Sequence, residues 1–216
     1  MKICFISAVK KVLALTAVIA VVSVFAGREC VKVGKTDVFL LETGGISIIS
    51  KDYPMLLGEV MLTTDGWNNK YPEMKNEKGK EWTYTLNRKL KNNEDLDMLK
   101  VVKQSSPGVF DASVSWKSVS GKNPKQAYCQ ISLNRNYKKI NLNGEEITLL
   151  QRNKYEWFSK KVAGFELKFS VTGAADCVIK SSQECYVIIT TLASGFQIKL
   201  RPVKISDGLK YTLVVK

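Results

Sequence analysis

One polar segment of the chain combines aromatic rings and hydrogen-bonding side chains at close spacing. Trp67 and Tyr71 are rigid aromatics, which provide a large contact area at a low cost in entropy. The hydrogen-bonding residues beside them are Asp65, Asn68 and Asn69. These five residues have the chemistry of a ligand-binding loop, with rings that stack on a sugar or a partner side chain and polar groups that bind hydroxyls. In the alternative interpretation, Trp67 covers the core and the asparagines hydrogen-bond the backbone of a turn.

The sequence contains no histidine, and this excludes several kinds of active site. Ser-His-Asp and Cys-His nucleophiles and His-ligated zinc or iron sites all need an imidazole. Close acidic groups occur only at Glu145-Glu146 and at Glu94-Asp95-Asp97. Adjacent residues of a strand face opposite sides, so Glu145 and Glu146 are not expected to share a site. We therefore expect a protein that is not an enzyme and has no metal or cofactor, with a carboxylate-dependent hydrolase as the catalytic alternative.

Positive charge is spread along the whole chain. There are 33 Lys+Arg against 20 Asp+Glu, which gives a net charge of +13, and lysine outnumbers arginine 28 to 5. Arginine supplies the planar fork that recognises bases and phosphates, whereas lysine is a hydrated point charge. The excess therefore favours attraction to anionic surfaces over nucleic-acid recognition. A basic coat that only keeps the protein solvated is the simpler alternative.

A second aromatic cluster lies in the C-terminal half. Tyr155, Trp157 and Phe158 are flanked by basic residues such as Lys154 and Lys160. This pattern suits an amphipathic binding edge. It equally suits the end of a strand, with the aromatics in the core and the lysines in water.

The first 26 residues have the composition of an export signal. A basic start with three lysines precedes the apolar run Val12–Ala26, and small residues stand before Gly27. The run of 15 residues is shorter than the ~20 needed to span a bilayer. We expect residues 1–26 to be a signal peptide that is cleaved on export to the periplasm, the cell surface or the medium. Alternatively they remain as an anchor, and this N-terminal segment is then the part that contacts the membrane.

Four cysteines follow the expected signal peptide. An even number of cysteines in an exported chain indicates disulfides. Cys177 and Cys185 are separated by seven residues in a pattern typical of a hairpin, so we expect them to pair. This leaves Cys30 to pair with Cys129. Four buried thiols, or an unpaired Cys30, are the alternatives.

The body of the chain alternates apolar and polar residues with a period of two, which is the pattern of half-buried strands. Asn143-Gly144 predicts a tight hairpin turn within Tyr137–Leu150. About a dozen short strands separated by turns are typical of an antiparallel β-sandwich of the immunoglobulin-like or jelly-roll type. Strands are expected at Asp37–Glu42, Ile46–Ser50, Glu59–Thr63, Glu81–Leu86, Phe110–Trp116, Ala127–Leu133, Lys139–Leu142, Glu145–Leu150, Phe165–Val171, Cys185–Leu192, Phe196–Leu200 and Leu209–Val215.

One segment departs from this all-β pattern. Asn92 can cap a short helix that has acids in its first turn and Leu96, Leu99 and Val102 on one face. A strand is the alternative here, because Val101 and Val102 are β-branched. We expect residues 27–216 to form one interlocked domain, with a sub-boundary near 105–108 as the alternative.

A signal peptide followed by a basic β-rich body is similar to the format of many exported bacterial surface and fimbrial proteins. Asp207–Val215 looks like the closing strand of fimbrial subunits, although this likeness covers nine residues and assigns no family. We expect an exported recognition protein for adhesion or surface binding, which uses the sandwich-end loops and a basic face. Its partner would be a glycan or an anionic cell-surface component. The alternative is a structural or assembly subunit of a fimbria or envelope complex, with other subunits as partners.

Overall fold

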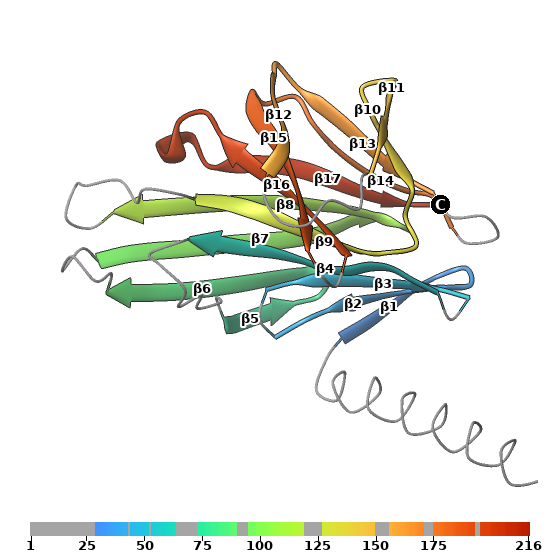
Figure 1. The fold of residues 1–216 in the computed structure, drawn as a ribbon. Coiled ribbons are helices and arrows are strands. Elements are labelled where there is room, and N and C mark those ends of the chain that lie inside the picture. The colour runs from blue at the N-terminus through green and yellow to red at the C-terminus, as the bar shows by residue number, and fades with distance from the viewer. Residues whose placement is uncertain are drawn as a thin grey trace, which may run out of the picture.

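The computed structural model of the chain is built from antiparallel β-strands (Figure 1). It describes residues 29–42, 44–51, 53–63, 73–89, 95–118, 127–149, 156–170, 175–192 and 195–216. These ranges contain strands β1 to β17 and one short 3-10 turn, η1 (Ile205–Asp207), and no α-helix. None of their residues forms a helix long and apolar enough to cross a membrane. The prediction of an all-β, antiparallel fold is therefore confirmed.

The strands form two sheets, and every pair of neighbouring strands is antiparallel. The first sheet has the order β1 (Glu29–Val33), β2 (Thr36–Leu40), β3 (Ile46–Ser50), β4 (Tyr53–Thr63), β9 (Ala127–Asn134), β16 (Gly195–Pro202), β15 (Cys185–Leu192) and β12 (Glu156–Val162). The second has the order β11 (Glu145–Thr148), β10 (Lys139–Leu142), β13 (Phe165–Phe169), β14 (Cys177–Ser181), β17 (Leu209–Val215), β8 (Val109–Ser118), β7 (Asp95–Ser106), β6 (Glu81–Lys89) and β5 (Glu73–Lys78).

Both sheets contain strands from the two halves of the chain. The N-terminal half, β1 to β8, meets the C-terminal half, β9 to β17, at the β4–β9 pair in one sheet and at the β8–β17 pair in the other. The expected sub-boundary near 105–108 falls in the turn that joins β7 to β8.

The two sheets share one hydrophobic core. In β8 the alternate residues Phe110, Val114 and Trp116 are buried, and similar alternation holds in β16 with Ile198 and Leu200. Buried residues from the eight-stranded and the nine-stranded sheet belong to a single packed cluster. At roughly 25 cal/mol per Å² of apolar surface removed from water, this shared burial is the main stabilising term of the fold.

The expected hairpin turn at Asn143-Gly144 is confirmed. Asn143 and Gly144 join β10 to β11 with φ of 53° and 87°, which is the positive-φ pair of a two-residue hairpin turn. The Gly144 backbone N–H donates a hydrogen bond of 2.8 Å to Asn141 Oδ1. The Asn143 amide also donates to the Gly164 carbonyl at 2.9 Å, so the turn is tied to the strand connection beside it.

The short helix that we expected after Asn92 is wrong over the residues that the structure describes. Residues 95–106 form strand β7, which pairs with β6 and β8 over most of its length. Met98, Lys100 and Val102 are buried, whereas Leu99 is 41% exposed. A lysine at an inward position interrupts the apolar alternation, and this is why the sequence pattern resembled a helix.

Neither of the two expected disulfides is present, because Cys30, Cys129, Cys177 and Cys185 are all free thiols. Cys177 begins β14 and Cys185 follows the far end of β14 by four residues, in the other sheet. Cys177 is four residues from the far end of β14, which in a strand is a distance of about 13 Å, and Cys185 lies beyond that end. Cys30 and Cys129 lie on β1 and β9, four strand spacings or roughly 19 Å apart. A disulfide needs Cα atoms within about 7 Å.

Candidate functional site

The loop residues expected to bind a ligand lie outside the described part of the chain. This applies to Asp65, Trp67, Asn68, Asn69 and Tyr71 alike. Their role in ligand binding therefore stays a prediction.

Two of the three aromatics in the second cluster pack at the edge of the core. Trp157 and Phe158 lie on the edge strand β12, both are half-buried, and their rings meet edge to face with centroids 6.2 Å apart. Trp157 Nε1 donates a hydrogen bond of 2.9 Å to Thr191 Oγ1. Tyr155 lies outside the described residues. The structure thus places Trp157 and Phe158 as core-edge residues rather than on an open binding edge.

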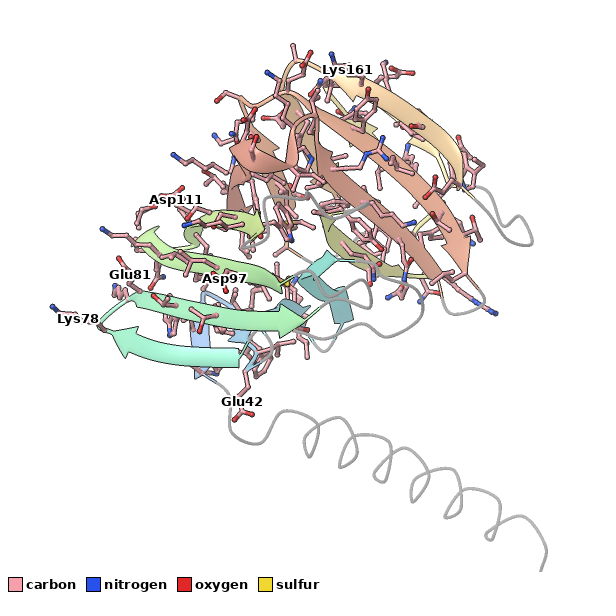
Figure 2. All side chains as sticks on the ribbon, turned by 90° about the vertical axis from the view of Figure 1, so that its left-hand side faces the viewer. Glu42, Lys78, Glu81, Asp97, Asp111 and Lys161 are labelled. Atoms are coloured by element: carbon pink, nitrogen blue, oxygen red, sulfur yellow. The ribbon has the colours of Figure 1, made fainter. Side chains whose placement is uncertain are left out.

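An open hollow of about 390 Å³ lies on the nine-stranded sheet. Its walls come from β6, β7, β8, β17 and β14, so strands of both halves of the chain contribute. The charged side chains that line it are Glu81, Lys103, Asp111, Lys180 and Lys210. All five are exposed, and Figure 2 shows Glu81 and Asp111 on the same side of the molecule.

Strand register places four of these charges in one row across the sheet. Lys180 of β14 is aligned with Thr212 of β17, Thr212 with Asp111 of β8, Asp111 with Lys103 of β7, and Lys103 with Glu81 of β6. Residues aligned in this way on one face have Cβ atoms about 5 Å apart. Thr212 Oγ1 donates a hydrogen bond of 2.7 Å to Asp111 Oδ1. The row therefore has a fixed order of charges along it.

The backbone of the fifth charged residue, Lys210, is held by side chains at the end of β14 and just after it. The ladder between β14 and β17 ends at Lys180 and Thr212. Beyond it, the Lys210 backbone N–H donates to Gln183 Oε1, and the Lys210 carbonyl accepts from Ser181 Oγ. The backbone N–H and carbonyl of Lys210 are thus both hydrogen-bonded to side chains, and this fixes the position of its backbone in β17.

The lysines of the hollow differ in their partners from five other lysines of the chain. Each of Lys139, Lys160, Lys161, Lys168 and Lys199 forms an ion pair of 2.6–2.9 Å with a glutamate. Lys103, Lys180 and Lys210 form no ion pair with any residue that the structure describes. Exposed ammonium groups without a protein partner are available to an anionic ligand.

The field around Lys180 also acts on its neighbour in the next strand. Glu166 of β13 is aligned with Lys180 and forms an ion pair of 2.8 Å with Lys168. The pKa of Glu166 is lowered, chiefly by its hydrogen bond from Lys168 and to a smaller extent by the charges of Lys168 and Lys180. Glu166 is therefore ionised at neutral pH and already bound to Lys168.

The two acids of the hollow are separated by a lysine. Glu81 and Asp111 are both exposed and stand on either side of Lys103 in the row. A glycosidase needs one carboxyl group kept protonated by its surroundings, and an apolar pocket usually provides this. Within the described ranges, no group of three metal-ligating side chains is placed to hold a metal ion.

Sequence reasoning did not single out Lys103, Lys180 and Lys210 as a binding set. Their positions in strands predict only that they face outward, and they are separated by up to 107 positions in the chain. The strand order brings them together. A search of protein-family models and a search of curated proteins found no match to the chain.

Proposed function

We propose that this chain is an exported, non-catalytic recognition protein that binds an anionic polymer of a cell surface through the hollow on the nine-stranded sheet. The observation that carries the proposal is the group Lys103, Lys180 and Lys210, three exposed cations without an ion-pair partner among the described residues. Ser113 and Ser182 line the same hollow, and serine hydroxyls can bind sugar hydroxyls.

Export and a sandwich architecture are parts of the same proposal. The basic and then apolar composition of residues 1–26 favours a signal peptide, and its removal leaves a net charge of +10. The single core shared by both sheets favours a β-sandwich of the immunoglobulin-like or jelly-roll type. A sandwich holds its outer faces rigidly, which suits recognition without catalysis.

An anionic glycan fits the hollow better than an anionic membrane does. Glu81 and Asp111 would be repelled by a continuous anionic surface, whereas each can accept hydrogen bonds from sugar hydroxyls. A fimbrial or assembly subunit has less support. At one edge of each sheet, strands β12 and β11 carry Lys160, Lys161, Glu145 and Glu146, and such charges oppose pairing with another strand there.

Binding to charged and uncharged dextrans tests this function. The protein purified after export should bind dextran sulfate in isothermal titration calorimetry and should not bind unmodified dextran. Replacing Lys103, Lys180 and Lys210 together with glutamine should weaken binding by at least ~10-fold, because cations whose contacts with the polymer release counterions are removed.

A matched control removes the same charge elsewhere. Glutamine at Lys139, Lys160 and Lys161 also removes three positive charges, but these lysines are already paired with glutamates. This variant should keep binding within about 2-fold of the wild type, since its charges lie outside the hollow. Equal losses in the two variants would show that net charge alone attracts the polymer and would refute the proposed site.

A further inference from the structure

The hollow has a positive end and a mixed end, and this difference can be read from the strand register. Lys103 stands between Glu81 and Asp111, so its charge is opposed by an acid on either side. Lys180 has Thr212 on one side and Glu166 on the other, and Glu166 is bound to Lys168. Positive charge is therefore least opposed where β14 meets β17.

Hydrogen bonds hold the backbone at the positive end. Lys180 is the last residue of β14 that pairs with β17, and Lys210 is held at both backbone groups by Ser181 and Gln183. Ser182, which follows β14 directly, also lines the hollow. Lys180, Lys210 and Ser182 thus line the same end of the hollow from a backbone that is held in place, which lowers the entropy lost on binding.

Resting on the proposed function, we propose that the Lys180–Lys210 end of the hollow binds the anionic substituent of a glycan, and that the Glu81–Asp111 end binds its neighbouring hydroxyls. Ser182 contributes a hydrogen bond to the anion. Ser181 and Gln183 are positioning residues, because they act through the backbone of Lys210 and keep its ammonium group over the site.

The two ends are distinguished by variants that remove the same kind of charge. Binding of dextran sulfate is measured for Lys180→Gln, Lys210→Gln and Lys103→Gln in the full exported protein at two salt concentrations. We expect a loss of about 5- to 10-fold for each of the first two, with a shallower salt dependence, because each removes one contact to the anion. Lys103→Gln should change affinity by less than about 2-fold, since its charge is already opposed by Glu81 and Asp111.

A charge-neutral variant tests the positioning role. Gln183→Ala removes the acceptor of the Lys210 N–H but no charge, and we expect a loss of about 3-fold together with faster hydrogen exchange at the Lys210 amide. Asn141→Ala is the control, because it removes a comparable side-chain acceptor from the Gly144 N–H in the β10–β11 turn. It should leave affinity unchanged. Equal affinity of Gln183→Ala and wild type, with faster exchange at Lys210, would refute the positioning role.

The dextran measurements distinguish a wrong assignment of the two ends from a wrong function. If wild-type protein binds no anionic dextran, both the function and the assignment of the two ends are wrong. If it binds but Lys103→Gln weakens binding as much as Lys180→Gln and Lys210→Gln, the two-ended site is wrong and the function stands. Binding to phosphatidylglycerol vesicles without binding to dextran sulfate would overturn the choice of a glycan.

Discussion

The two halves of the chain build their parts of the sheets in different ways. In the N-terminal half, β1 to β4 and β5 to β8 are two meanders, and each strand pairs with the next one along the chain. In the C-terminal half the chain repeatedly crosses between the sheets: β10, β11, β13, β14 and β17 lie in one, and β9, β12, β15 and β16 in the other.

This difference has consequences for stability and for folding. Contacts between sequence neighbours close small loops, so a meander can form, and open, one hairpin at a time. Interleaved strands cannot leave one sheet without disturbing the other, and pairings such as β12 with β15 and β14 with β17 join distant parts of the chain. We therefore expect the C-terminal half to form late and to open only with the whole molecule.

The largest expected effect comes from matched truncations in the two halves. Ile198 of β16 and Ile48 of β3 are both fully buried. Replacing either with alanine should cost about 2–5 kcal/mol of unfolding free energy through lost burial and a cavity. Hydrogen exchange should show faster opening throughout both sheets for Ile198→Ala, but chiefly in β1 to β4 for Ile48→Ala. Identical exchange maps for the two variants would contradict the contrast between the halves.

A smaller effect on the free energy of unfolding is expected from alanine substitutions at two glycines, Gly195 and Gly34, which both have positive φ. At Gly195, where β15 turns into β16 beside β9, a Cβ atom would lie 2.0 Å from the Leu133 carbonyl oxygen, so the backbone must shift. At Gly34, between β1 and β2, a Cβ would meet nothing within 4 Å. Urea unfolding should show a loss of at least about 2 kcal/mol for Gly195→Ala. The loss for Gly34→Ala should be about 1 kcal/mol, from backbone strain alone. Equal losses would show that the β9–β16 contact is not tightly packed.

The third comparison concerns the cysteines, and its size depends on pH. Burial raises the pKa of the Cys177 and Cys185 thiols to about 12. In the unfolded chain they lose their protons near pH ~8.5, so the folded state holds more protons above that pH. The free energy of unfolding should therefore fall as the pH rises from about 9 towards 12, by up to ~1.4 kcal/mol per pH unit for each thiol. Below pH ~8.5 this contribution is fully present.

Urea unfolding at pH 8 and pH 10.5 measures this slope, and the Cys177→Ala/Cys185→Ala double variant should show a shallower one. Iodoacetamide at pH 8 adds a direct comparison of the halves. It should modify the exposed Cys30 of β1 in the native protein, and the buried Cys177 and Cys185 only after unfolding. If native Cys30 resists iodoacetamide and reacts only after treatment with a reducing agent, it forms a disulfide, contrary to the structure.

Some features of the fold could be predicted because they are local. The bounds of β3, β10, β15 and β17 match the expected segments, and the turn at Asn143 and Gly144 was predicted from two residues. The alternation of apolar and polar residues did not predict strand β7, because Lys100 occupies a buried position there. The hairpin expected between Cys177 and Cys185 is wrong, because the chain passes from one sheet to the other between them.

The sequence by itself determined that the chain folds into antiparallel strands, which side chains of most strands face the core, and that histidine chemistry is absent. These properties depend on residue type and on the period-two geometry of a strand. Only the tertiary structure decided that Lys103, Lys180 and Lys210 line one hollow, because strand order depends on how both sheets bury their apolar faces together. No local pattern in the sequence encodes which distant strands become neighbours.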